Sequence, residues 1–419
     1  MPASITAAYL DRYRALAADS PAGLLPLTGA QRRFLIGRRL APQGGRSDLV
    51  PLFFAYPRGT VDPGRLARAA TAVAARHPAL CGAFATVRGT PVLRVGGPSA
   101  EAARVPVAPG ETAEGALLAA LLDWPADGPA LRLLLARAPD GEEEILALAL
   151  DHAACDEHAL GVLTAELTEA YATGEQPAAG PDRAALDAYR EAVHLQLAAE
   201  DAAATPAAHA HWGRRLAALT GAGGGTAHGT ALLSARLPAA GGAARTAVFP
   251  ALLDAVGTAA HHLYATDGPL ALGYPWGGRP PGAPAALGCF LNTLVHPAGS
   301  HTADLEALAD DWWEDLDHAG TPFDEVVRAA RAAGAGWTGA LDAVLTLEDL
   351  GRRPPLAFDG VPGRETHLGG RPLAAPLAVS ASHGTDLLVK FAWDEGRFPA
   401  ASARTAFERM LAALRGHLS

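Results

Sequence analysis

The chain has 419 residues, a length that indicates two to three domains of about 150 residues each. Apolar residues make up 49% and charged residues 19%, which excludes a disordered tail and a coiled coil. The net charge of −10 argues against a nucleic-acid partner, and no apolar run reaches the roughly 18 residues that cross a membrane. The N-terminal residues lack the layout of a signal peptide, so we expect a cytoplasmic protein.

Hydrophobic periodicity and turn residues predict mixed helices and strands along the whole chain. From the N-terminus we expect helices at 5–18 and 28–39, a strand at 50–56, a helix at 63–76, strands at 80–87 and 91–95, a helix at 112–123, strands at 130–137 and 144–150, and a helix from 157. There follow helices at 182–200 and 205–219, a strand at 230–237, a helix at 244–264, strands at 270–275 and 289–296, helices at 302–316 and 322–333, strands at 342–347 and 386–393, and a C-terminal helix.

The segment 173–181, which is rich in Pro and Gly, is the best candidate for a linker. We therefore expect an N-terminal helix with its linker (1–23), then two domains of similar content (24–176 and 177–419). The three cysteines are too few and too scattered for a disulfide framework or a zinc site, so no metal is expected.

The sharpest local feature is the segment from Asp151 to Glu157, which follows a continuous apolar run typical of a strand buried on both faces. At such a strand end His152 would stand at the mouth of a cavity. Asp156 could fold back to orient the loop and leave a ring nitrogen free. The pattern H-x-x-x-D is common, so a capping aspartate beside a hydrogen-bonded histidine remains an alternative.

In its place in the chain this segment resembles the H-H-x-x-x-D-G motif of condensation domains from nonribosomal peptide synthetases. Further segments are similar to motifs of that family in the family's order: Pro26–Gln31, Arg76–Leu80, His211–Leu216, Gly278–Pro280, Gly288–Leu294, and His318 with Pro322–Asp324. The resemblance runs from about residue 24 to the C-terminus. It implies an α/β (α+β) fold of two chloramphenicol acetyltransferase-like lobes in a V-shaped pseudo-dimer with a tunnel between them.

The resemblance also implies an acyltransferase that joins a carrier-bound acyl or peptidyl thioester to an acceptor amine, as in antibiotic biosynthesis. His152 would orient or deprotonate the amine, and Asp156 would be structural. Glu157, Asn292 and Arg279 would line the tunnel, together with Cys81. The partners would be donor and acceptor peptidyl carrier proteins and other synthetase domains. No cofactor is expected to bind directly, because the substrates arrive on phosphopantetheine.

Three positions depart from the family pattern. Asp151 stands where the family has its first histidine, Glu157 replaces the motif glycine, and Cys81 replaces an arginine that pairs with the motif aspartate. A buried carboxylate without a partner costs several kcal/mol or takes up a proton. We therefore expect another cation at Asp156, with Arg279 as the candidate.

The departures leave alternatives open. A condensation-like domain that has lost catalysis and recruits a tailoring oxygenase is the second interpretation. The third is a heterocyclization or free-standing ester-forming variant, since Asp151-x-x-x-x-Asp156 and Gln31 with Gly37-Arg38 resemble the cyclization branch, whereas Ala159 does not. A second segment that resembles the motif, His261–Gly268, is interpreted as the end of a helix. The glycine run 221–225 precedes no phosphate-binding lysine.

Overall fold

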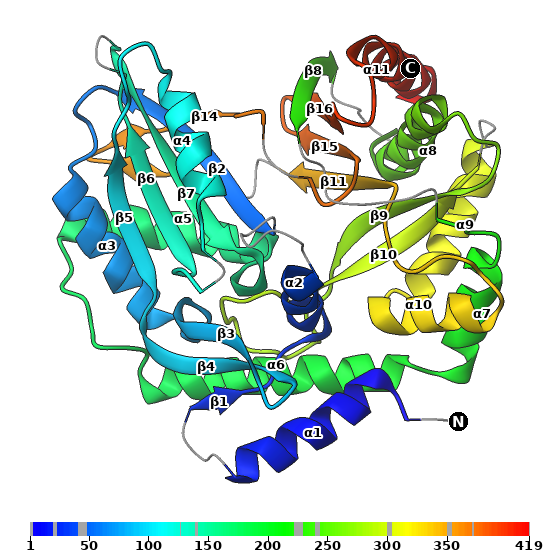
Figure 1. The fold of residues 1–419 in the computed structure, drawn as a ribbon, viewed down its shortest axis with the longest axis horizontal. Coiled ribbons are helices and arrows are strands. Elements are labelled where there is room, and N and C mark those ends of the chain that lie inside the picture. The colour runs from blue at the N-terminus through cyan, green and yellow to red at the C-terminus, as the bar shows by residue number, and fades with distance from the viewer. Residues whose placement is uncertain are drawn as a thin grey trace. The chain divides into compact units, whose positions relative to one another are not determined.

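The computed structural model describes residues 3–19, 23–40, 48–125, 127–138, 141–221, 229–238, 244–299, 304–349, 354–370 and 373–418. The chain forms two compact units (Figure 1). The first consists of Met1–Asp201, Gly277–Leu291 and Arg353–Leu368, and the second of Ala202–Trp276, Asn292–Arg352 and Gly369–Ser419. Within the described residues, no helix is long and apolar enough to cross a membrane.

The first unit is built around a sheet in the order β14-β2-β7-β6-β5, with a smaller sheet β1-β4-β3. Its elements are α1 (Ile5–Asp19), β1 (Leu24–Leu25), α2 (Gly29–Leu40), β2 (Leu49–Pro57), α3 (Pro63–Arg76), η1 (Pro78–Leu80), β3 (Cys81–Val87), β4 (Thr90–Pro98), β5 (Ala100–Val105), α4 (Ala113–Leu122), β6 (Leu131–Ala136), β7 (Glu143–Asp151), η2 (His152–Ala154), α5 (Glu157–Thr173), most of α6 (Arg183–Ala203), β12 (Ala357–Phe358), β13 (Val361–Pro362) and β14 (Arg364–Thr366).

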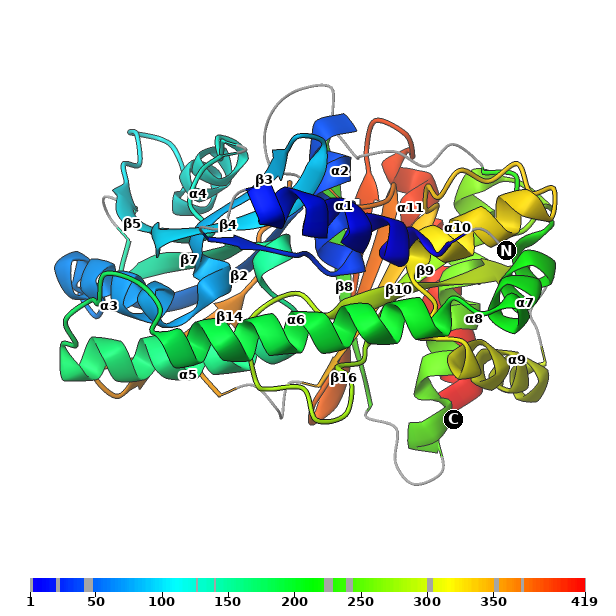
Figure 2. The same cartoon turned by 90° about the horizontal axis from the view of Figure 1, so that it is seen from below.

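Strand β7 is buried on both faces, as its apolar run predicted. Leu146, Leu148 and Leu150 pack into the core cluster that contains α3 and α5, which contact each other (Figure 2). The alternate residues Ala147 and Ala149 face a second cluster that contains α4. Successive side chains of a strand point to opposite faces, so helices on both sides require apolar residues at every position.

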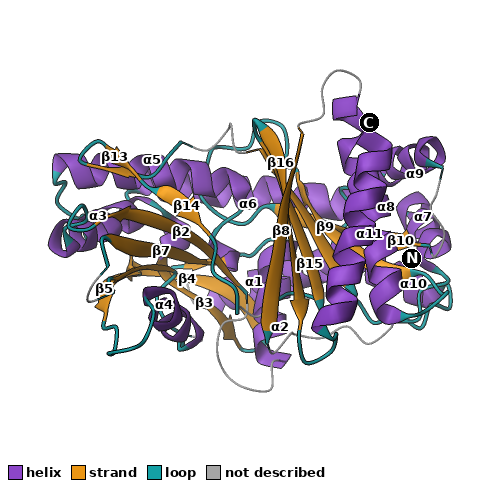
Figure 3. Cartoon of the chain, turned by 90° about the horizontal axis from the view of Figure 1, so that it is seen from above, coloured by secondary structure: helices purple, strands orange, loops and turns teal. Residues whose placement is uncertain are grey.

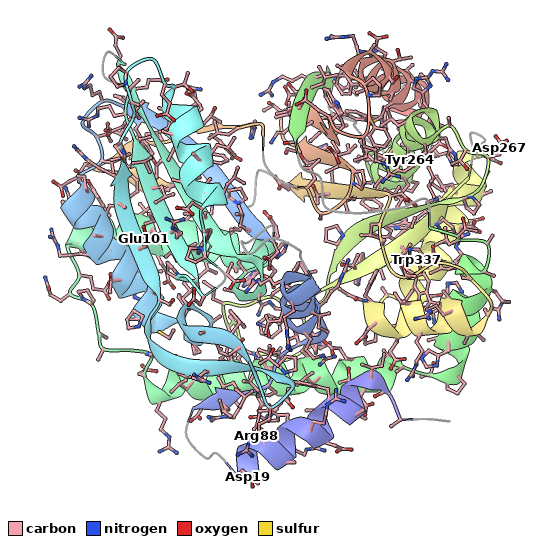
Figure 4. All side chains as sticks on the ribbon, viewed as in Figure 1. Asp19, Arg88, Glu101, Tyr264, Asp267 and Trp337 are labelled. Carbon is pink, nitrogen blue, oxygen red and sulfur yellow. The ribbon has the colours of Figure 1, made fainter. Side chains whose placement is uncertain are left out.

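The β3–β4 hairpin belongs to the smaller sheet of the first unit. Its turn residues Arg88 and Gly89 have φ of 47° and 80°, the positive values that two-residue hairpin turns require. Figure 4 shows Arg88 and Asp19 close together, and Nη1 of Arg88 lies 3.0 Å from Oδ2 of Asp19 at the end of α1. The side chains of both ion-pair partners are exposed to solvent, so this pair contributes little to the free energy of unfolding.

The second unit has a sheet in the order β10-β9-β11-β15-β16-β8, and helices α8 and α11 lie along it (Figure 3). Two labelled side chains in Figure 4 fix its loops: the Tyr264 hydroxyl donates to the Asp342 carbonyl at 2.8 Å, and the Trp337 indole donates to the Ala340 carbonyl at 2.6 Å. The elements are α7 (Pro206–Leu216), β8 (Thr230–Pro238), α8 (Ala244–Tyr264), β9 (Leu270–Gly277), β10 (Leu291–Ala298), α9 (Leu305–Asp317), α10 (Phe323–Ala332), β11 (Ala343–Asp349), β15 (Leu377–His383), β16 (Asp386–Asp394) and α11 (Ala400–Leu418).

The two units share a topology. In the first, β2 pairs antiparallel with β7, β7 antiparallel with β6, and β6 parallel with β5. In the second, β8 pairs antiparallel with β16, β16 antiparallel with β15, and β15 parallel with β11. Helix α3 follows β2 as α8 follows β8, and α5 follows β7 as α11 follows β16. The expectation of two lobes with similar topology is confirmed.

The division between the units differs from the predicted one at residue 177. Helix α6 extends the first unit to Asp201, because Tyr189, Val193 and Leu197 belong to its core. Residues 174–181 of the predicted linker form a loop, whereas Thr173 still belongs to α5, and the loop leads to a helix of the same unit. Two later segments also return to the first unit, which the sequence did not predict. Strands β5, β14 and β15 were not predicted either.

Two further sequence features are the motif-like segment His261–Gly268 and the glycine run 221–225. The second motif-like segment does end a helix, because α8 stops at Tyr264 and the His261 ring makes hydrogen bonds of 2.9 Å to the carbonyls of Thr266 and Ala298. Apart from Gly221, the glycine run 221–225 lies outside the described residues.

Candidate active site

The candidate site lies at the turn between β7 and α5. Strand β7 ends at Asp151, the short helix η2 carries His152, and α5 begins at Glu157. Asp156 is the N-cap of α5, and its Oδ1 accepts a hydrogen bond from the backbone N–H of Ala159 at 2.9 Å. A short acidic side chain suits this position because the first N–H groups of a helix lack partners within the helix.

Arg279 is the cation that pairs with Asp156. Its Nη2 lies 3.0 Å from Oδ2 of Asp156, and its Nη1 donates to the Ala286 carbonyl at 2.7 Å. The backbone N–H of Phe290 donates to the same carboxylate at 3.1 Å, and the guanidinium lies 4.1 Å from the centre of the Phe290 ring. Asp156 therefore ties the turn to the returning segment 277–291, as a structural residue does.

Cys81 has a different place from the one expected. It has no exposed surface, and its thiol donates to the Ala74 carbonyl at 3.1 Å. Burial raises the pKa of this thiol to about 11. A side chain without accessible surface does not line a substrate passage, so this expectation is corrected.

Asp151 is 1% exposed and makes two kinds of contact. Its Oδ1 accepts a hydrogen bond from the backbone N–H of Ala153 at 2.9 Å and also contacts Nη2 of Arg38. Arg38 pairs at the same time with Asp48, with its Nε 2.8 Å and its Nη2 2.6 Å from Oδ2. The sequence had indicated Arg38 only as part of a motif, because its two partners lie in other elements.

His152 is held from two directions and is half-buried. Its ring stacks on the Phe34 ring at 4.3 Å between centres, and its backbone N–H donates to the Asp48 carbonyl at 3.1 Å. Nδ1 is buried and has no hydrogen-bond partner among the described residues. Desolvation lowers the pKa of this histidine, although the backbone groups of His152 and Cys155 and the carboxylates of Asp48 and Asp151 act to raise it. The imidazole is therefore neutral near pH 7 and can accept a proton.

The start of α2 supports this turn through a capping box. The Thr28 hydroxyl accepts from the Gln31 N–H at 3.3 Å, and the Gln31 amide oxygen accepts from the Thr28 N–H at 3.1 Å. Gln31 then donates to the Ala153 carbonyl at 2.8 Å, and Thr28 donates to the Cys289 carbonyl at 2.9 Å. The spacing T-x-x-Q could have predicted this box from the sequence, whereas its contacts with the turn could not be predicted.

The other candidate residues are spread over both units. Glu157 is exposed in the first turn of α5, where a negative charge is favourable. Asn292 belongs to the second unit, and its amide donates to the carbonyls of Ala319 at 2.9 Å and Thr321 at 2.6 Å. Cys155 is buried, and burial raises its pKa, so it is no activated nucleophile. Among the described residues, no cluster of His, Cys, Asp or Glu could hold a metal ion.

Comparison with known proteins rests on structure. No family model matches the sequence, and no curated protein matches it. The first condensation domain of the calcium-dependent antibiotic synthetase, solved with a substrate analogue, has a TM-score of 0.68 at 17% identity, covering 95% of this chain and 97% of that one. The chain has the fold of a condensation domain.

Two further structures define what this condensation-domain fold can host. A variant of the starter condensation domain of rhizomide synthetase, in complex with C8-CoA and Leu-SNAC, has a TM-score of 0.68 at 15% identity and covers 96% of both chains. The epimerization domain from the third module of tyrocidine synthetase B has a TM-score of 0.60 at 15% identity, covering 94% of this chain and 97% of that one. Since one fold serves condensation and epimerization domains, the reaction must be argued from the site.

Proposed function

We propose that this condensation-like chain forms an amide bond between a thioester donor and an acceptor amine, both presented on phosphopantetheine arms of peptidyl carrier proteins. The state of the His152 ring carries the proposal. His152 is neutral near pH 7, its ring is fixed by Phe34, and its Nδ1 has no partner among the described residues. A histidine with only a structural role would be expected to use its ring nitrogens in hydrogen bonds.

The proposed reaction needs one proton acceptor. The amine nitrogen attacks the thioester carbonyl carbon, the imidazole takes a proton from that nitrogen or orients it, and the carbon–sulfur bond then breaks. The thiol leaves with the proton, so atoms and charge balance. General-base assistance contributes about 10²–10⁴ in rate, and holding both reactants together contributes about 7–11 kcal/mol. Asp156 and Arg279 maintain the turn and take no proton.

Two other functions have observations on their side. Recruitment of an oxygenase by an inactive domain is favoured by Asp151 and Glu157, which depart from the family motif. Heterocyclization is favoured by the spacing of Asp151 and Asp156. It is opposed by their ion pairs with Arg38 and Arg279, which leave neither carboxylate available as a base.

The test is a transfer assay with donor- and acceptor-loaded carrier domains, followed by mass spectrometry. His152→Ala is expected to reduce product formation at least about 100-fold while the melting temperature is retained. The matched control is His158→Ala, a change at an exposed histidine in the first turn of α5, which should leave transfer unchanged. Equal, low transfer by the wild type and His152→Ala, together with binding of an oxygenase, would establish the recruiting function instead.

A further inference from the structure

One face of α2 covers the turn that carries His152. Gln31, Phe34 and Arg38 follow one another at spacings of three and four residues, which places them on one side of a helix. Gln31 bonds the Ala153 carbonyl, Phe34 stacks on the His152 ring, and Arg38 contacts Asp151. The helix therefore contacts three successive residues, 151–153, at the end of β7 and the start of η2.

Arg38 neutralises two carboxylates at once. Its side chain is 9% exposed, and those of Asp48 and Asp151 are 13% and 1% exposed. Burial alone would lower the pKa of Arg38, but the two carboxylates outweigh burial and raise it. The guanidinium is thus always charged, and its planar fork reaches both acids.

The turn itself does not require an arginine. At the corresponding place in the second unit, Asp394 ends β16, and its Oδ1 accepts from the Gly396 N–H at 2.9 Å, as Oδ1 of Asp151 accepts from the Ala153 N–H. Asp394 makes no ion pair within the described chain. It is also less buried than Asp151. Arg38 is therefore an addition at the turn that carries the histidine.

Both acids of the Arg38 cluster are connected to His152. Asp48 accepts the His152 backbone N–H through its carbonyl, and Asp151 precedes His152 in the chain. The charged groups that act on the imidazole from the adjoining elements are these two carboxylates, one ahead of β2 and one at the end of β7. Arg38 on α2 is the ion partner of both.

We propose that Arg38 is a positioning residue for His152, which fixes the turn through Asp48 and Asp151 and screens the imidazole from both carboxylates. The benefit of this positioning for catalysis rests on the proposed function of His152. The effect of Arg38 on the pKa of His152 can be measured without any transfer reaction. It also accounts for the aspartate at position 151, because a histidine there would leave Arg38 with Asp48 alone.

The test is the titration of His152 by NMR, with the ring signal assigned through His152→Gln. In Arg38→Met the two carboxylates lose their cation, so the pKa of His152 should rise by about one unit relative to the wild type. The transfer rate should fall by up to about 100-fold, as expected for a misplaced catalytic group. Arg39→Met is the matched control, because Arg39 is the exposed neighbour at the same helix end, and it should change neither quantity.

Arg38→Lys separates screening from positioning. It keeps the charge but loses the fork, so the pKa of His152 should stay near the wild-type value while the transfer rate falls. If Arg38→Met does not fold, it is compared in the Asp151→Asn background, where adding Arg38→Met leaves only Asp48 unscreened and should raise the pKa of His152 by less than one unit relative to Asp151→Asn alone. An unchanged His152 titration in folded Arg38→Met overturns the proposal. A raised pKa with no transfer in the wild type supports the role of Arg38 and rejects the proposed function instead.

Discussion

The turn after β7 and the turn after β16 are built on the same backbone plan. Asp151 and Asp394 each end a strand, and the N–H of each donates at 2.9 Å to a carbonyl just ahead of the neighbouring strand, at Ala130 and Pro376. Each also accepts from the N–H two residues on. In the first turn His152 follows the aspartate, whereas Glu395 follows it in the second.

The two turns share some of these features and differ in others. The aspartate and its local hydrogen bond occur in both units, so they serve the strand-to-helix connection. His152, its contact with Phe34, the Asp156 cap and the Arg38 ion pairs belong to the first turn. The position of the motif's first histidine thus holds an aspartate of the kind that the fold uses elsewhere for the same turn.

The largest effect on stability should come from Asp156→Ala. Helix α5 would lose its cap and Arg279 would lose its carboxylate, whereas α11 follows Pro399 and has no such pair to lose. We expect a loss of about 3 kcal/mol in the free energy of unfolding, at the lower end for broken buried pairs because both side chains are partly exposed. Chemical denaturation measures this loss, and an unchanged melting temperature would show that Asp156 is not structural.

A smaller effect should distinguish the two turn aspartates. Asp394→Ala removes one hydrogen bond at a partly exposed site, so about 1 kcal/mol of stability and no transfer activity should be lost. Asp151→Ala removes the same bond and also an ion partner of Arg38, so about 2–3 kcal/mol and part of the transfer rate should be lost. If the two variants lose equal stability and both keep full activity, Arg38 has no special role at the first turn.

The smallest effect should appear as a difference in pH dependence. Because the folded-state pKa of His152 is lowered, protonation favours the unfolded chain. The contribution of His152 to stability should be complete above about pH 6.5 and decline as the pH falls toward the folded-state pKa. When the pH is lowered from 7.5 to 5, the free energy of unfolding should therefore fall more for the wild type than for His152→Gln. Chemical denaturation at the two pH values measures this difference. An equal fall in the free energy of unfolding for both proteins would mean that His152 has the same pKa in the folded and unfolded chain.

Local signals in the sequence predicted much of the fold. The apolar run of β7 and the helical spacing of α5 depend on neighbours in the chain, and both were found where expected. Strand β5 was missed because its alanines and charged residues resemble a loop. Strand β15 was missed because small and polar residues alternate in it, although it is buried between β11 and β16.

The site could be predicted only where a single segment carries it. His152 and Asp156 lie in one motif, and Arg279 followed from the need to neutralise a buried carboxylate. The contact of Arg38 with Asp151 joins residues 113 positions apart, and nothing local indicates it. The burial of Cys81 likewise depends on packing between α3 and β3, which the sequence does not display.

The two segments that return to the first unit set a rule for recombining such chains. Residues 277–291 bring the arginine of Asp156, and residues 353–368 bring the edge strand β14 beside β2. A chimera that joins residues 1–201 of one chain to the remainder of another would therefore pair Asp156 with a foreign arginine and β2 with a foreign strand. Exchange that respects the fold must transfer three pieces of sequence together, although the gene presents them far apart.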